Sequence, residues 1–288
     1  MLDILSKLQN SFVKISNKIR YNDPWTLSKK ENDSNKSGDV IKHLDLFANN
    51  LIINSLRDCL DIKYIASEEN DELITINKNG KYLVSIDPVD GSSNIKNNIG
   101  VGTIFSVFMY ENNHILSGRN IVMAGYCLYS SNTTLVLALN NMVNLYQLNE
   151  LGNFKLIKED YKMPIIGDSY AINESSRELW NDLKVVDFVE KMKLHKKTQR
   201  WVGSLVADAN RILYSGGTFI YPSNSKNPNG KIRLLYEAYP MAYIFDICGG
   251  YATNGENNIL DISYPQNIHQ KVPIYLFSKT EYEIYGLC

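Results

Sequence analysis

The stretch KYLVSIDPVDGSSNI, residues 81–95, carries the clearest structural pattern in this sequence. Its first six residues are mostly apolar or aromatic, which predicts a buried strand. Pro88 lacks the N–H that a strand ladder needs, so we expect the strand to end at Asp87 and the chain to turn. Gly91 permits tight backbone geometry there, and the polar residues 92–94 can open a helix.

Two carboxylates, Asp87 and Asp90, stand at this predicted turn. Magnesium prefers oxygen ligands in octahedral geometry, and carboxylates at the end of a strand can supply them. Backbone N–H groups at the start of a helix suit a phosphate. An ordinary Asp-Pro turn with a side-chain cap is the alternative, but the flanking strand and the Ser-Ser-Asn sequence favour a site for a metal-bound phosphate ester.

Outward from this stretch, helical and strand patterns fill most of the chain. Apolar residues at steps of three and four predict helices at 2–19, from Val40 onward, at 204–214 with Ser204 as N-cap, and at 240–248. Apolar runs predict further strands at 62–66, 101–109, 121–129, 133–139, 143–148, 217–221 and 231–236. No helix fits between 121 and 148, so we expect antiparallel pairing there. The class is α/β or α+β, in two packed halves, 1–165 and 166–288.

Composition excludes several classes of protein. The chain has 288 residues, 44% of them hydrophobic, and a formal net charge of -1, so no overall positive field attracts nucleic acid or an anionic membrane. The four cysteines are far apart, which is typical of free thiols in a reducing compartment. The N-terminus is charged throughout, and no stretch approaches the length of a membrane span. These features are typical of a cytosolic enzyme.

Further carboxylates follow other predicted elements. Glu68 and Glu69 come after the strand at 62–66, and they either point to opposite sides of an extended chain or both sit in a loop. The polar stretch 29–39 reads as a plain linker or an active-site loop, and it ends at Asp39. Asp45 then lies on the following helix. Taken singly, each of these carboxylates is an ordinary surface charge or helix cap.

The segment NPNGKIRLLYE (227–237) contributes one cation and one more carboxylate. Lys231 and Glu237 are six residues apart, so in a regular strand they share a face. On that face they could meet a phosphate and a metal. From the spacing alone, a routine, exposed pair is the favoured explanation.

These segments, in this order, resemble the class I fructose-1,6-bisphosphatases, a branch of the inositol monophosphatase-like sugar phosphatases. DPVDGSSNI is almost identical to the signature of that family. Further similar segments are GDVIKHLD, SEE, GKYLVSIDP, VGTIFSV, AGYCLY, TTLVLAL, SYAINES, RWVGSLVADANRIL, GGTFIYP, NPNGKIRLLYEAYPMAYI and NIHQ (267–270). The resemblance implies a layered αβαβα fold and hydrolysis of the 1-phosphate of fructose 1,6-bisphosphate, in gluconeogenesis, with two or more Mg²⁺ ions; Mn²⁺ is an alternative.

The resemblance also implies a role for each matching residue. The expected metal ligands are Glu68, Asp87, Asp90, Glu237 and the Val89 carbonyl. The residues expected to activate water are Glu69, Asp45 and Asp39. The residues expected to bind substrate are Asp90, Gly91, Ser92, Ser93, Asn173, Arg200, Trp201, Tyr221 and Lys231. Arg200 matches an arginine that reaches the pocket of a neighbouring subunit, which implies a homo-oligomer, with a tetramer expected.

The chain departs from the family pattern where the remote phosphate is expected. Trp201 replaces a tyrosine, and Ser176 stands at the position of another. Trp keeps an aromatic face but has only an N–H donor. These changes keep open a sedoheptulose-1,7-bisphosphatase or a dual-specificity bisphosphatase. A catalytically silent metabolite-binding regulatory protein is the alternative from another class.

We predict weak or absent inhibition by AMP. Regulated members of the family carry extra residues before the first helix that help to form an AMP site, whereas this sequence starts at that helix. Lys81 and Tyr82 match family positions associated with AMP, but Met109 stands where an arginine is usual. Titration with AMP during steady-state turnover checks this, and potent allosteric inhibition would refute it.

Overall fold

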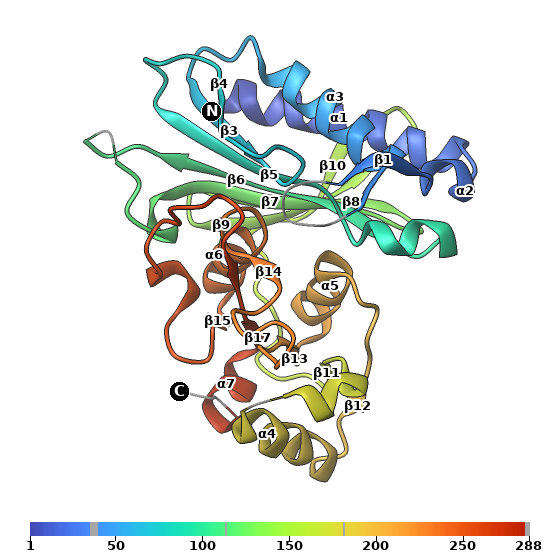
Figure 1. Ribbon diagram of the computed structural model, residues 1–288, viewed down its shortest axis with the longest axis vertical. Coiled ribbons are helices and arrows are strands. Elements are labelled where there is room, and N and C mark those ends of the chain that lie inside the picture. The colour runs from blue at the N-terminus through green and yellow to red at the C-terminus, as the bar shows by residue number, and fades with distance from the viewer. Residues whose placement is uncertain (35–39, 113, 181, 286–288) are drawn as a thin grey trace.

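The computed structural model describes residues 1–34, 40–112, 114–180 and 182–285, and it has helices and sheets in the order αβαβα (Figure 1). The outer helices on one side are α1 (Leu2–Tyr21) and α3 (His43–Leu56). Helices α5 (Leu205–Ser215) and α6 (Tyr239–Cys248) lie between the two sheets. Helices α4 (Leu183–Leu194) and α7 (Lys279–Tyr285) cover the far sheet. The predicted layered fold is therefore confirmed.

The large sheet has eight strands in the order β10-β9-β8-β7-β6-β5-β3-β4. These strands are β3 (Ile62–Ser67), β4 (Ile74–Thr75), β5 (Tyr82–Asp90), β6 (Val101–Met109), β7 (Ile121–Tyr129), β8 (Thr133–Leu139), β9 (Met142–Leu148) and β10 (Phe154–Lys158). Among them, β3 and β5 pair in parallel, whereas the meander from β5 to β10 is antiparallel. The expected antiparallel pairing between 121 and 148 is confirmed.

The second sheet has five strands in the order β12-β11-β13-β17-β15. They are β11 (Ser169–Ala171), β12 (Thr198–Gln199), β13 (Thr218–Tyr221), β15 (Tyr251–Thr253) and β17 (Ile274–Phe277). A separate pair joins β14 (Ile232–Arg233) to β16 (Lys271–Val272). Short helices are α2 (Pro24–Leu27), η1 (Ser92–Asn97), η2 (Gly118–Asn120), η3 (Glu174–Leu179) and η5 (Ile259–Asp261).

Apolar side chains fill the space between successive layers. On α1, Ile4, Leu8 and Phe12 are each at most 1% exposed and pack against α3 and the large sheet. The central cluster joins the other face of that sheet to α5, α6 and the second sheet. A third cluster packs α4 on the outer face of the second sheet. The helix predicted at 2–19 is thus confirmed, because its apolar stripe has a sheet to cover.

Strand β5 does not end at Asp87 as expected, but continues through Pro88 to Asp90. Asp87 pairs with Ile104 and Asp90 with Gly102, so β5 holds one extra residue. This bulge tolerates the missing N–H of the proline, and the Pro88 carbonyl still accepts a hydrogen bond from the Thr103 hydroxyl at 2.8 Å. Asp87 and Asp90 therefore belong to the C-terminal end of a buried strand rather than to a free turn.

The strand predicted at 231–236 is mostly wrong. It stops at Arg233, and Leu234–Ala238 forms a single turn of π-helix, η4, all of whose residues are buried. The Glu237 carboxylate accepts a hydrogen bond from the backbone N–H of Arg233 at 2.5 Å, so this backbone donor has a partner where the strand ends. The alternation argument that placed Lys231 and Glu237 on one face therefore does not apply.

The helix expected from Val40 begins at His43 instead. Residues Val40–Lys42 form β2, which pairs antiparallel with β1 (Lys30–Ser34) inside the stretch predicted as a loop. The Asp45 carboxylate accepts the backbone N–H of Lys42 at 2.9 Å and so fixes the start of the helix. Asp39 lies outside the described residues.

In the C-terminal half, the helices predicted at 204–214 and 240–248 are confirmed as α5 and α6. Helix α5 begins after Ser204, whose hydroxyl accepts the Ala207 N–H at 3.5 Å, as predicted. The chain crosses between the sheets after β10 and before β11, and the boundary placed between 165 and 166 stays a prediction. Within the described part of the chain, no helix combines the length and apolar character that crossing a membrane requires.

Candidate active site

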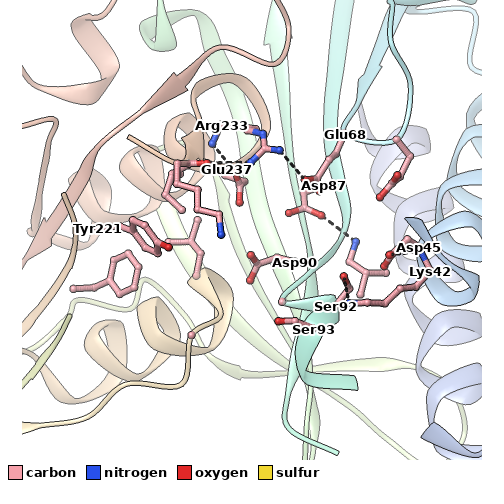
Figure 2. Close-up of a pocket in the computed structure, with 18 of the residues that line it drawn as sticks. Lys42, Asp45, Glu68, Asp87, Asp90, Ser92, Ser93, Tyr221, Arg233 and Glu237 are labelled. Carbon is pink, nitrogen blue, oxygen red and sulfur yellow. Dashed lines mark hydrogen bonds and ion pairs between the residues drawn. The ribbon is translucent and has the colours of Figure 1, made fainter. Parts of the chain in front are cut away.

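A cavity of about 320 Å³ opens between the C-terminal end of β5, helix α3 and the segments around β13 and η4 (Figure 2). It brings together residues that are far apart in the chain. The predicted site residues that line it are Asp45, Glu68, Glu69, Asp87, Val89, Asp90, Gly91, Ser92, Ser93, Trp201, Tyr221, Lys231 and Glu237.

Three carboxylates form the centre of this cavity. Asp87 and Asp90 come from the bulged end of β5, and Glu237 comes from the π-helical turn η4 (Figure 2). One oxygen of each lies within 4.8 Å of the others, and the three residues are 1%, 8% and 6% exposed. Such closely spaced, buried carboxylate oxygens suit a hard divalent cation.

The local electrostatics point to the same need. Burial raises the pKa of Asp87 well above its usual range, and the nearby Glu68 and Asp90 carboxylates raise it further. Burial also raises the pKa of Glu237, with Glu68 and Asp90 adding to the effect. Without a cation, these groups bear the cost of desolvation and of mutual repulsion. The residues present therefore fit a divalent metal.

Asp90 is also held by the N-terminus of α5. One of its oxygens accepts the Ser204 hydroxyl and the Val206 N–H, both at 2.7 Å. Burial raises the pKa of Asp90 to about 6, while these two donors act to lower it. Gly91 has φ +76°, and a Cβ there would lie 2.5 Å from the Ser204 hydroxyl oxygen, so a side chain would disrupt this contact.

Glu68 and Glu69 both sit in the turn after β3, so the loop alternative is the one observed. The Glu68 N–H donates to the Ile86 carbonyl at 3.1 Å, which ties this turn to β5. Arg233 extends from β14 toward the same turn, with its Nη2 atom 4.0 Å from Glu68 Oε1. The turn after β3 thus supplies an acidic wall of the cavity, and Arg233 from a distant segment lies against it.

The opposite side of the cavity belongs to α3 and η1. Lys42 donates from its Nζ atom to the Ser92 hydroxyl at 3.0 Å (Figure 2). Burial lowers the pKa of Lys42, although Asp45 and Glu69 act to raise it. Sequence reasoning missed Lys42 and Arg233, even though both stand inside segments that the family resemblance had already marked.

An aromatic wall completes the cavity. Trp201 stacks on Phe219 with ring centroids 5.9 Å apart and planes 6° apart, and it meets Tyr221 at 5.8 Å. Asn173 does not line the main cavity but an adjoining small one, together with Trp201, Tyr221 and Ser176. Its side chain accepts the Ser175 N–H at 3.2 Å.

Arg200 is the predicted site residue that the described structure leaves outside both cavities. It follows β12, is exposed, and donates its backbone N–H to the Tyr170 carbonyl at 2.9 Å. Arg200 is therefore not part of the lining of this chain's own cavity. The expected contribution of Arg200 to a neighbouring subunit stays a prediction.

We predict that the metal-free protein loses stability as pH rises, and that Asp45→Asn makes this loss smaller. Burial raises the pKa of Asp45 from 3.8 to about 7, so the folded state holds its proton more tightly than the unfolded state. Stability then falls as pH rises from about 4 to about 7, by about 4 kcal/mol at most. Thermal unfolding with EDTA at several pH values measures this.

The exposed carboxylate Asp58 provides a matched control. Asp58→Asn should follow the wild-type pH dependence, whereas Asp45→Asn should flatten it and keep the contact to the Lys42 N–H. An unchanged slope in Asp45→Asn would contradict the assignment of this cost to Asp45.

Comparison with known proteins agrees with this geometry along the whole chain. A family model described as the N-terminal domain of fructose-1-6-bisphosphatase matches residues 1–159, and one described as its C-terminal domain matches residues 163–285. Fructose-1,6-bisphosphatase class 1 of Sulfurihydrogenibium sp. (strain YO3AOP1) is 43% identical over 86% of this chain and 79% of its own length. Fructose-1,6-bisphosphatase 1 of Rattus norvegicus is 40% identical over 96% of this chain and 80% of its own.

A solved structure gives the same answer for the fold. The crystal structure of Leishmania major fructose-1,6-bisphosphatase in holo form superposes with a TM-score of 0.92, at 31% identity, covering 98% of this chain and 92% of that one. The family models together span nearly all of the sequence, and the buried carboxylate cluster lies where their two domains meet. This chain therefore belongs to the fructose-1,6-bisphosphatase family.

Proposed function

We propose that this protein hydrolyses the 1-phosphate of fructose 1,6-bisphosphate to fructose 6-phosphate and phosphate, as a step of gluconeogenesis, with Mg²⁺. The observation that carries the proposal is the buried group of Asp87, Asp90 and Glu237 beside a cavity whose far side holds Lys231. A monophosphatase would not need a cationic side chain such as Lys231 far from the carboxylates, because its substrate has no second phosphate. The names of the relatives support the same substrate.

Four carboxylates and one carbonyl would hold the metal: Glu68, Asp87, Asp90, Glu237 and the Val89 carbonyl. Two or more Mg²⁺ ions are proposed, and Mn²⁺ can replace them. Bound there, the metal would supply positive charge against the phosphate oxygens and lower the pKa of water. The Val89 N–H donates to Asp87 Oδ1 at 3.0 Å and so orients that carboxylate.

Glu69 and Asp45 are the proposed groups that orient the attacking water and take its proton. Both line the cavity, and burial raises the pKa of Asp45 to about 7. A base with a pKa near the working pH exchanges protons most effectively. Asp39 is proposed to assist, although it lies outside the described residues.

The two phosphates would occupy opposite ends of the cavity. Gly91, Ser92 and Ser93 would hold the 1-phosphate, and Lys42 stands at hydrogen-bond distance from Ser92. Asp90 would contact the substrate beside them. The residues proposed for the sugar and the 6-phosphate are Lys231, Tyr221, Trp201 and Asn173.

Arg200 is proposed to complete the pocket of a second copy, because its side chain is exposed outside its own cavity. This requires a homo-oligomer, for which a tetramer is the expected form. The cytoplasmic location stays a prediction.

One observation favours a second bisphosphate substrate. Trp201 lies flat against Phe219 and offers no hydroxyl to a phosphate, so the remote end of the cavity would bind its ligand through Lys231, Tyr221 and aromatic surface. Sedoheptulose 1,7-bisphosphate, which is one carbon longer, is therefore the alternative substrate. The complete carboxylate set argues against a catalytically silent regulatory protein.

We expect rapid, EDTA-sensitive phosphate release from fructose 1,6-bisphosphate with Mg²⁺, and almost none from the Asp90→Asn variant. The amide keeps an oxygen for Ser204 and Val206, so the variant should fold, but it removes charge from the metal site. Sedoheptulose 1,7-bisphosphate and inositol monophosphate are assayed in parallel. Full activity in Asp90→Asn would refute the carboxylate assignment, and no turnover of any ester by metal-loaded wild type would refute the enzyme.

We expect Lys231→Ala to raise KM for fructose 1,6-bisphosphate about tenfold or more with a small change in kcat. A charge-assisted hydrogen bond to a remote phosphate contributes about 1.5–3 kcal/mol to binding in both the ground and transition states. Lys226, exposed and outside the cavity, is the matched control. A lowered kcat with unchanged KM in Lys231→Ala would contradict the role.

A further inference from the structure

His269 lies outside the cavity but connects two segments that supply its carboxylates. One ring nitrogen, Nδ1, lies 2.8 Å from the Tyr236 hydroxyl, and the other, Nε2, lies 3.1 Å from the Asn70 carbonyl oxygen. Because a carbonyl only accepts, Nε2 carries the proton, and in the neutral ring Nδ1 accepts the Tyr236 hydrogen. Both nitrogens are therefore used, one toward each half of the molecule.

The Asn70 end of this connection belongs to the acidic turn after β3. The Asn70 N–H donates to the Ser67 carbonyl at 3.2 Å and closes the turn that contains Glu68 and Glu69. The Asn70 side chain accepts a hydrogen bond from buried Asn49 of α3 at 2.9 Å. Asn70 thus anchors that turn, and His269 holds it from the C-terminal half.

The Tyr236 end belongs to η4. Tyr236 precedes Glu237 in the sequence, and its side chain is 0% exposed. The segment carrying His269 is itself fixed to this region, because the Gln270 carbonyl accepts the Leu234 N–H at 2.8 Å and β16 pairs with β14. A movement of His269 would therefore move η4 with it.

We propose that His269 is a positioning residue that sets the spacing between the Glu68–Glu69 turn and Glu237. Carboxylates gathered without a cation repel one another, and the turn and η4 come from different halves of the chain. A ring bonded at 2.8 and 3.1 Å to both halves opposes that separation and keeps the oxygens at ligand spacing. Metal ligands need such outer support to keep their geometry. The proposal rests on the proposed function, in which these carboxylates bind the metal.

The chain contains a matched control for the Tyr236 hydroxyl. Tyr239 is three residues further on, is also 0% exposed, and donates its hydroxyl hydrogen to the Ile262 carbonyl at 2.7 Å. Tyr236→Phe and Tyr239→Phe each remove one buried hydroxyl from the same region. Only the first removes a contact to His269, so any difference in metal affinity reports on the connection rather than on stability.

The experiment measures Mn²⁺ affinity of the full-length protein by electron paramagnetic resonance of free Mn²⁺, without substrate. We expect Tyr236→Phe and His269→Gln to bind Mn²⁺ about tenfold more weakly, and Tyr239→Phe to bind it like wild type. The double variant Tyr236→Phe/His269→Gln should be no weaker than either single variant, because the contacts act as one unit. In turnover assays, the Mg²⁺ concentration for half-activity should rise while KM for the ester stays unchanged.

Wild-type affinity in folded Tyr236→Phe and His269→Gln would overturn the proposal, as would an equal loss in Tyr239→Phe. Thermal unfolding of each variant with EDTA establishes that it is folded, and Tyr236→Phe serves if His269→Gln is not. A wild-type protein that binds no Mn²⁺ would overturn the metal site itself, and this proposal with it. Wild-type binding with unaffected variants would leave the metal site standing and remove only the role of His269.

Discussion

The concentration of negative charge at Asp87, Asp90 and Glu237 is the constraint around which this structure is organised. Three carboxylates within 4.8 Å, each at most 8% exposed, are unfavourable in the absence of a cation. The surrounding structure reduces this cost in specific ways. The N-terminus of α5 donates two hydrogen bonds to Asp90, and the backbone of Arg233 donates one to Glu237.

These contacts also explain why the two sheets need each other. Asp90 ends a strand of the large sheet, whereas Ser204 and Val206 begin a helix that packs under the second sheet. The acidic turn after β3 faces Arg233 and His269, both from the C-terminal half. Stability of the interface and assembly of the site therefore depend on the same hydrogen bonds, and a metal bound at the centre would strengthen both.

The cavity separates two kinds of recognition. Its acidic end is built from short, buried segments whose backbone is locked by the bulge in β5 and the π-turn η4. Its other end has exposed Lys231 and the stacked rings of Trp201 and Phe219. Rigid carboxylates suit the proposed chemistry of a metal-bound phosphate, while an aromatic wall beside a flexible lysine would tolerate differences in the sugar. The acidic end therefore indicates the type of reaction more clearly than the aromatic end indicates the length of the sugar.

The sequence by itself determined the α/β class and most strands of the large sheet, because hydrophobic period is a local property. The layered order and the carboxylates of the candidate site followed from its resemblance to a known family. It misplaced the end of β5 and the segment after Arg233, where a bulge and a π-turn replace regular structure. It also did not find Lys42 and Arg233 in the lining of the cavity, or the contact of His269 with Asn70. Only the tertiary structure decided these, since the contacts join residues far apart in the chain, 114 positions for Asp90 and Ser204 and 199 for Asn70 and His269. No local pattern encodes a hydrogen bond that exists only after two sheets have packed together.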